Sequence, residues 1–160
     1  MANQVLRAGD RAPAFILSGD DGERVRLTEY RGRWVVLYFY PRDFTAGCTA
    51  QACAFRDSEK AFAEVGAVLL GIGPDEVESH ARFRTELGLG FPLLHDRDAR
   101  VASRYGVWRE KRTGGHRYLG LVRSTMLVDP SGRIAQIWDN VRVKGHVDRV
   151  LTGLHEELAR

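Results

Sequence analysis

One stretch, residues 38–53, constrains the fold and chemistry of this chain more than any other. An unbroken apolar run, residues 34–40, leads into it and predicts a central strand buried on both faces of a sheet. A turn containing proline and glycine follows, and then a helical pattern runs from about residue 48 to residue 63. The stretch therefore predicts a strand, a loop and a helix in succession, with Cys48 at the start of the helix.

The first turn of a helix is a position that activates a cysteine. Backbone N–H groups there lack partners within the helix, and the helix dipole is positive at this end, so both favour the thiolate over the thiol. The thiolate is the nucleophilic form. Thr45 can hydrogen-bond a small substrate at the sulfur or serve as a turn residue or helix cap, and Pro41 stiffens the pocket wall. Cys48 is thus the candidate nucleophile.

The second cysteine, Cys53, follows Cys48 by five positions. On a regular helix this spacing puts the two Cα atoms about 8–9 Å apart on nearly opposite sides. A disulfide requires roughly 4.4–6.8 Å, so the sulfurs can bond only after the first helical turns unwind. Alternatively, Cys53 is a small buried apolar residue. A thioredoxin-type redox pair has two residues between its cysteines, whereas this chain has four.

The histidines do not extend the cysteine pair into a metal site. None lies at zinc-ligand spacing from a cysteine, and we expect all of them on the surface or in loops. They are His80, His95, His116, His146 and His155.

The length is that of one ordinary domain, residues 1–160. The chain has 24 basic and 21 acidic residues, and the net charge of +3 includes no long basic run, which indicates a solvated surface rather than nucleic-acid binding. The first ten residues are too polar for a secretory signal, and no apolar run approaches the ~20 residues needed to cross a bilayer. We expect a cytoplasmic protein without membrane attachment, a setting in which two cysteines are more often reduced, reactive or metal-binding than joined in a structural disulfide.

The remaining pattern predicts an α/β protein. Turn signals at residues 19–22 predict an N-terminal β-hairpin, and Asp98 is expected to cap a short helix that ends at Arg104. Residues 108–120 have a mixed pattern with a turn at 113–115. Further elements are expected as strands at 65–72, 91–94, 124–128 and 133–139 and helices at 74–88 and 147–158. This order matches a thioredoxin-like layout, with a central mixed β-sheet, helices on both faces and an N-terminal β-hairpin extension.

The cysteine loop also resembles a known active-site signature. Pro41, Thr45 and Cys48 form the pattern P-x-x-x-T-x-x-C, which resembles that of the peroxiredoxins. The wider segment, residues 38–57, is similar to the bacterioferritin-comigratory, or Q-type, subgroup, and the likeness continues through residues 106–108 and 123–129. Family members usually carry proline where this chain has Ala46. We expect this difference to affect the dynamics of the loop rather than the reaction class.

The resemblance implies a thioredoxin-fold thiol peroxidase that reduces hydrogen peroxide and organic hydroperoxides. Cys48 would be the peroxidatic cysteine and Cys53 the resolving cysteine, joined in an intramolecular disulfide that thioredoxin or a similar dithiol reduces. Arg123 would lie beside the sulfur, Thr45 would hydrogen-bond the peroxide, and Pro41 would shield the thiolate from water. The resemblance implies no cofactor and no metal, and a monomer or a weak homodimer.

Two other interpretations stay open at this point. One is a general thiol–disulfide oxidoreductase, against which the cysteine spacing argues. The other is a peroxide-sensing redox switch that passes its oxidation to a partner protein. From the residues alone, an arginine such as Arg123 at the start of a strand is more often a solvated charge at a sheet edge than a catalytic residue.

Overall fold

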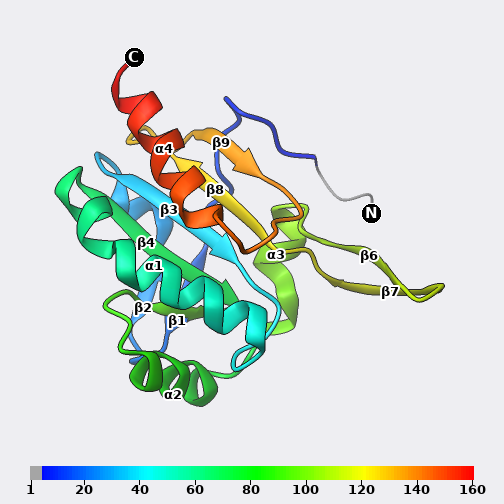
Figure 1. The fold of residues 1–160 in the computed structure, drawn as a ribbon. Coiled ribbons are helices and arrows are strands. Elements are labelled where there is room, and N and C mark those ends of the chain that lie inside the picture. Colours follow the sequence, from blue (N-terminus) through cyan, green and yellow to red (C-terminus); the bar gives the residue numbers. More distant parts are fainter. Residues whose placement is uncertain (1–4) are drawn as a thin grey trace.

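The apolar run before the cysteine loop forms the middle of a mixed β-sheet. The computed structural model describes residues 5–160, and within them the larger sheet has the strand order β2-β1-β5-β4-β3-β8-β9 (Figure 1). Strand β3 pairs in parallel with β4 and antiparallel with β8. The strands are β1 (Ile16–Gly19), β2 (Arg24–Arg26), β3 (Trp34–Phe39), β4 (Ala67–Gly73), β5 (Leu93–His95), β8 (Ser124–Val128) and β9 (Ile134–Trp138).

Strand β3 is apolar throughout because it contributes to two cores. Val35, Leu37 and Phe39 join one buried cluster. Val36 and Tyr38 alternate with them and join the other cluster, on the opposite face of the sheet. The sheet therefore separates two cores, and β3 supplies side chains to both.

Helices cover both faces of the sheet, as the sequence predicted. Helices α1 (Ala46–Glu64), α2 (Val77–Leu87) and α4 (His146–Leu158) supply side chains to the cluster that contains Tyr38. The short helix α3 (Arg100–Arg104) lies on the other face, together with the 3-10 turn η1 (Leu27–Tyr30). Strands β1 and β2 form the predicted N-terminal hairpin, and β1 also pairs with β5, so the hairpin extends the main sheet.

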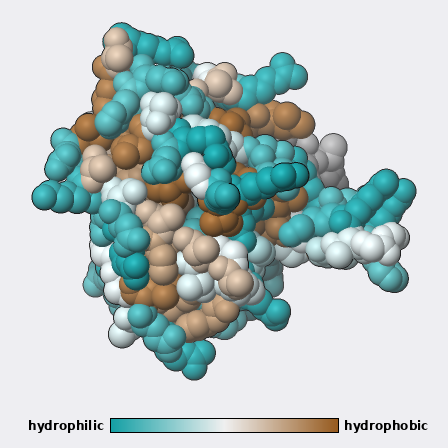
Figure 2. Space-filling view, viewed as in Figure 1, coloured by the Kyte–Doolittle hydropathy of each residue, from teal (hydrophilic) through white to brown (hydrophobic). Residues whose placement is uncertain are grey.

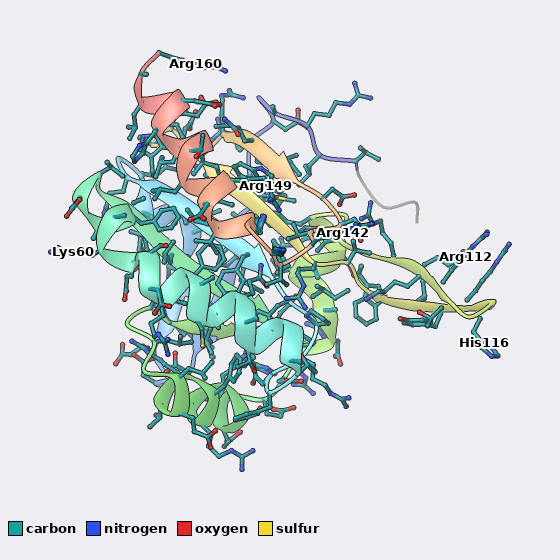
Figure 3. All side chains as sticks on the ribbon, in the orientation of Figure 1. Lys60, Arg112, His116, Arg142, Arg149 and Arg160 are labelled. Atoms are coloured by element: carbon teal, nitrogen blue, oxygen red, sulfur yellow. The ribbon has the colours of Figure 1, made fainter. Side chains whose placement is uncertain are left out.

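A second, two-stranded sheet projects from this body. Strands β6 (Trp108–Thr113) and β7 (His116–Leu121) pair with each other through a turn at Gly114 and Gly115, both of which have positive φ. Figure 2 shows mainly hydrophilic and neutral side chains along this arm, and Figure 3 shows Arg112 and His116 pointing outward at its far end. The mixed pattern that the sequence shows over residues 108–120 is thus an exposed hairpin.

Asp98 was predicted to cap the short helix α3, but Asp96 caps it instead. The two carboxylate oxygens of Asp96 each accept a backbone hydrogen bond of 2.9 Å, from the N–H groups of Val101 and Ala102. Asp98 is exposed and has a φ of +56°, and Ala99 has a φ of +54°. These two left-handed residues make a 3-10 turn, η2 (Arg97–Ala99), before α3, so the capping carboxylate comes from farther back in the chain.

Two of the histidines expected on the surface or in loops are buried. His80 and His146 are 0% and 1% exposed. Each can be buried because its ring is hydrogen-bonded to a side chain, Asp43 for His80 and Thr125 for His146. No helix within residues 5–160 is both long enough and apolar enough to span a membrane.

Candidate active site

Cys48 lies in the first turn of α1, where the sequence predicted it. Thr45 has an extended backbone (φ −78°, ψ 154°) and forms the N-cap, and the helix begins at Ala46, two residues before the predicted start. Cys48 is therefore the third helical residue, and its N–H group has no carbonyl partner four residues back within the helix. Only 1% of the residue is exposed, so the sulfur is held in a largely water-free position.

Arg123 supplies a positive charge directly at this sulfur. Its Nη2 donates a hydrogen bond of 3.2 Å to Cys48 Sγ, although 75 residues separate the two in sequence. Arg123 lies between β7 and β8, and its carbonyl accepts a 2.8 Å bond from the backbone N–H of Val141. The structure thus brings together the two residues on which the sequence resemblance depends most.

Two further residues of α1 hold the guanidinium in place, and neither was predicted as a site residue. Gln51 is fully buried and its Oε1 accepts a hydrogen bond from Arg123 Nη1. A Cβ added to Gly47 would lie 3.1 Å from Arg123 Nη2, so glycine leaves the room that the guanidinium occupies. Gln51 follows Cys48 by three residues and therefore shares its helix face, a signal that could have identified it.

Among the described residues, two buried donors near the site have no hydrogen-bond partner. Gln51 Nε2 has no hydrogen-bond partner among the residues that the structure describes. The same holds for the hydroxyl of Tyr38 on β3. Burial, and next the nearby negative charge of Cys48, raise the pKa of Tyr38 far above its usual value. Tyr38 therefore stays a neutral phenol at every physiological pH.

His146, the first residue of α4, is paired with Thr125 of β8. Its Nε2 is 2.8 Å from Thr125 Oγ1. Burial, followed by the positive charges of Arg149 and Arg123, lowers the pKa of His146 to about 4. His146 is therefore neutral at pH 7. The positive charge at the sulfur comes from Arg123.

The other predicted residues of the loop, Pro41 and Thr45, precede Cys48 in the chain. Pro41 lies two positions after the last residue of β3 and is partly buried. The Thr45 hydroxyl is partly exposed and donates a 3.0 Å bond to the carbonyl of Arg42, which leaves its lone pairs available. Among the residues that the structure describes, neither of the two forms a hydrogen bond with Sγ.

Cys53 lies one and a half turns farther along the same uninterrupted helix. It is partly exposed, and both cysteines are free thiols. In this folded form of α1 the sulfurs are on different sides of the helix. Within residues 5–160, no group of three or more His, Cys, Asp or Glu side chains is arranged to hold a metal ion.

A thioredoxin-like sheet, a buried cysteine in the first turn of a helix and an arginine on its sulfur together define a cysteine-based peroxidase. The family model that matches the chain, over residues 8–137, is that of the AhpC/TSA family. The chain belongs to this family, and it is a peroxiredoxin.

Individual relatives agree with the subgroup that the sequence suggested. Peroxiredoxin Bcp of Bacillus subtilis is 44% identical over 94% of this chain and 96% of its own length. Peroxiredoxin Bcp of Escherichia coli is 42% identical over 94% of this chain and 97% of its own. A solved structure of the Xanthomonas campestris bacterioferritin comigratory protein matches with a TM-score of 0.89 at 37% identity, covering 94% of this chain and 99% of that one. The resemblance to the bacterioferritin-comigratory subgroup is confirmed.

Proposed function

We propose that this peroxiredoxin reduces hydrogen peroxide and organic hydroperoxides at Cys48. The observation that carries the proposal is the 3.2 Å contact between Arg123 Nη2 and the buried Sγ in the first turn of α1. A cation and a helix N-terminus at one sulfur favour the thiolate. The Xanthomonas campestris relative is described for its alkyl peroxide reduction activity, which supports organic hydroperoxides as substrates.

In the first step the thiolate attacks the terminal peroxide oxygen. A sulfur–oxygen bond forms as the oxygen–oxygen bond breaks, and the leaving oxygen takes one proton and departs as water or an alcohol. Sulfur loses two electrons and becomes a sulfenic acid, while the peroxide gains them. Arg123 stabilises the negative charge that spreads over sulfur and both oxygens. Thr45 hydrogen-bonds the peroxide in line with Sγ, and Pro41 limits the access of water.

In the second step Cys53 resolves the sulfenic acid. The Cys53 thiol attacks the oxidised sulfur, a disulfide forms and the sulfenic oxygen leaves as water. Because both cysteines lie on one continuous helix, the first turns of α1 must unwind before the sulfurs can meet. Thioredoxin or a similar dithiol then reduces the disulfide by thiol–disulfide exchange.

Two single substitutions test these assignments. Cys48→Ser should abolish peroxide consumption. Cys53→Ser should keep one fast turnover, seen as a single change in tryptophan fluorescence on mixing with peroxide, but should not cycle with thioredoxin and its reductase. If the Cys53 variant cycles as well as the parent, Cys53 is not the resolving residue. Efficient reduction of protein disulfides without peroxide consumption would instead favour a general oxidoreductase.

We further propose that residues 1–160 form one domain that works as a cytoplasmic monomer. The two cores share a single sheet, which supports one cooperative unit. Two free thiols that cycle through a disulfide need a compartment with a dithiol supply. Light scattering after gel filtration should give the mass of one chain, and unfolding by urea should give a single transition.

A further inference from the structure

A buried polar cluster ties the cysteine loop to α2, and nothing in the peroxide chemistry above uses it. Its centre is Asp43, which is 4% exposed. Asp43 Oδ1 accepts a 2.7 Å bond from the Tyr40 hydroxyl, and Oδ2 accepts 2.7 Å bonds from Ser79 Oγ and His80 Nδ1. The backbone N–H of Asp43 donates a 2.6 Å bond to Asp75 Oδ2. This cluster joins the loop to the start of α2.

The partners of His80 determine its protonation state. Nδ1 faces the Asp43 carboxylate, and Nε2 is 3.2 Å from the carbonyl of Gly73. A carboxylate and a carbonyl only accept, so both ring nitrogens must carry hydrogen and the ring is an imidazolium. The Tyr40 hydroxyl, 3.3 Å from Nδ1, gives its own proton to Asp43 and adds no competing donor.

The charge balance of the cluster agrees with this geometry. Burial alone would lower the pKa of His80, but the hydrogen bond and charge of Asp43 outweigh it, with help from Gly73 and Asp75, and the pKa is raised. Burial would likewise raise the pKa of Asp43, but bonds from His80, Tyr40 and Ser79 outweigh it and the pKa is lowered. The two form an ion pair with side chains that are 0% and 1% exposed.

The position of this pair connects it to the reactive sulfur. Asp43 lies two residues from both Pro41 and Thr45, and among the described residues no side chain caps the start of α1. The next residue, Phe44, has a φ of +64°, a strained conformation that persists only where the surroundings fix it. Its ring packs edge-on against Phe83 of α2, with centroids 5.1 Å apart. Two consecutive loop residues are therefore held by α2.

We propose that His80 and Asp43 are positioning residues, a buried ion pair that holds the loop in the arrangement that captures peroxide and limits the unwinding of α1. The proposal rests on the proposed role of Cys48 as the peroxidatic residue. Because the pair stabilises the packed loop against the unwound one, weakening it should shift the two chemical steps in opposite directions. Peroxide capture should slow, since Pro41 and Thr45 are misplaced, while disulfide formation with Cys53 should accelerate.

Stopped-flow tryptophan fluorescence with hydrogen peroxide separates the two steps. His80→Gln keeps one donor for Asp43 but removes the charge, and we expect capture to fall about 10- to 100-fold because small misplacements of a reacting group cost this much. Ser79→Ala removes a single bond to Asp43 and should give a smaller change of the same sign. Ser103→Ala is the matched control, since Ser103 is also a partly buried helical serine, on α3, and should leave both rates at the parent values.

The outcomes separate this proposal from the one on which it rests. If the parent does not oxidise Cys48 with peroxide, the proposed function fails. If the parent does so but folded His80→Gln and Ser79→Ala both keep the parent rates, or lose both steps together, the positioning role is refuted.

A measurement independent of activity is nitrogen NMR of the His80 ring at pH 7, with His80→Gln as the assignment control. Two protonated ring nitrogens are expected, and a neutral ring would overturn the ion pair.

Discussion

Acid should destabilise this protein through His146, and the size of the effect follows from its surroundings. The folded pKa of about 4 compares with about 6.5 for an exposed histidine, so the unfolded chain binds the proton more readily. The stability that His146 contributes is therefore present at pH 7 and is lost as the pH falls from 6.5 toward 4. Between pH 7 and pH 5 the loss is about 2 kcal/mol of unfolding free energy.

His146→Gln isolates this contribution from those of other groups. Glutamine can still hydrogen-bond Thr125 but does not titrate, so the variant should lose about 2 kcal/mol less than the parent between pH 7 and pH 5. The raised pKa of His80 acts in the opposite direction, favouring the folded state in acid, and cancels in the comparison because both proteins contain it. The assay is urea unfolding followed by tryptophan fluorescence at the two pH values. Equal losses in the two proteins would refute the reasoning.

Three further changes probe the sulfur and its loop. Arg123→Ala, made together with Cys53→Ser, should slow peroxide oxidation of Cys48 by about 10²–10³-fold, the usual cost of losing a charge-stabilising donor, as measured by stopped flow. Gly47→Ala should slow the same step by a smaller factor, because its Cβ would press on Nη2 from 3.1 Å, with a urea midpoint near that of the parent. Ala46→Pro occupies the first helical position and should raise the unfolding free energy by about 0.4–1 kcal/mol and slow disulfide formation; an unchanged urea midpoint would contradict this.

The reactive centre could be predicted because its signal is local. The apolar run, the turn and the helix start around Cys48 follow from residue patterns within twenty positions. Arg123 could be assigned to the active site only through the family resemblance, because 75 residues separate it from the sulfur. An isolated arginine before a strand does not by itself indicate a catalytic role.

Features that depend on distant partners were missed. His80 and His146 are buried because Asp43 and Thr125 lie beside them, and those partners are 37 and 21 residues away. The strands of the β6–β7 hairpin were not predicted, because they pair mainly with each other and lack the apolar alternation of a sheet that faces a core. The capping carboxylate was misplaced by two residues because left-handed backbone at Asp98 cannot be read from its side chain.

The projecting β6–β7 hairpin carries the net positive charge of the chain, so the charge is distributed unevenly over the molecule. It holds four basic residues and one acidic residue, so the rest of the chain has twenty of each and is neutral as a whole. An anionic surface within a Debye length of about 8–10 Å therefore attracts the hairpin and exerts little net pull on the remainder. Arg123, which contacts Cys48 Sγ, follows the last residue of β7 by two positions, so the charged hairpin is joined directly to the segment that completes the active site.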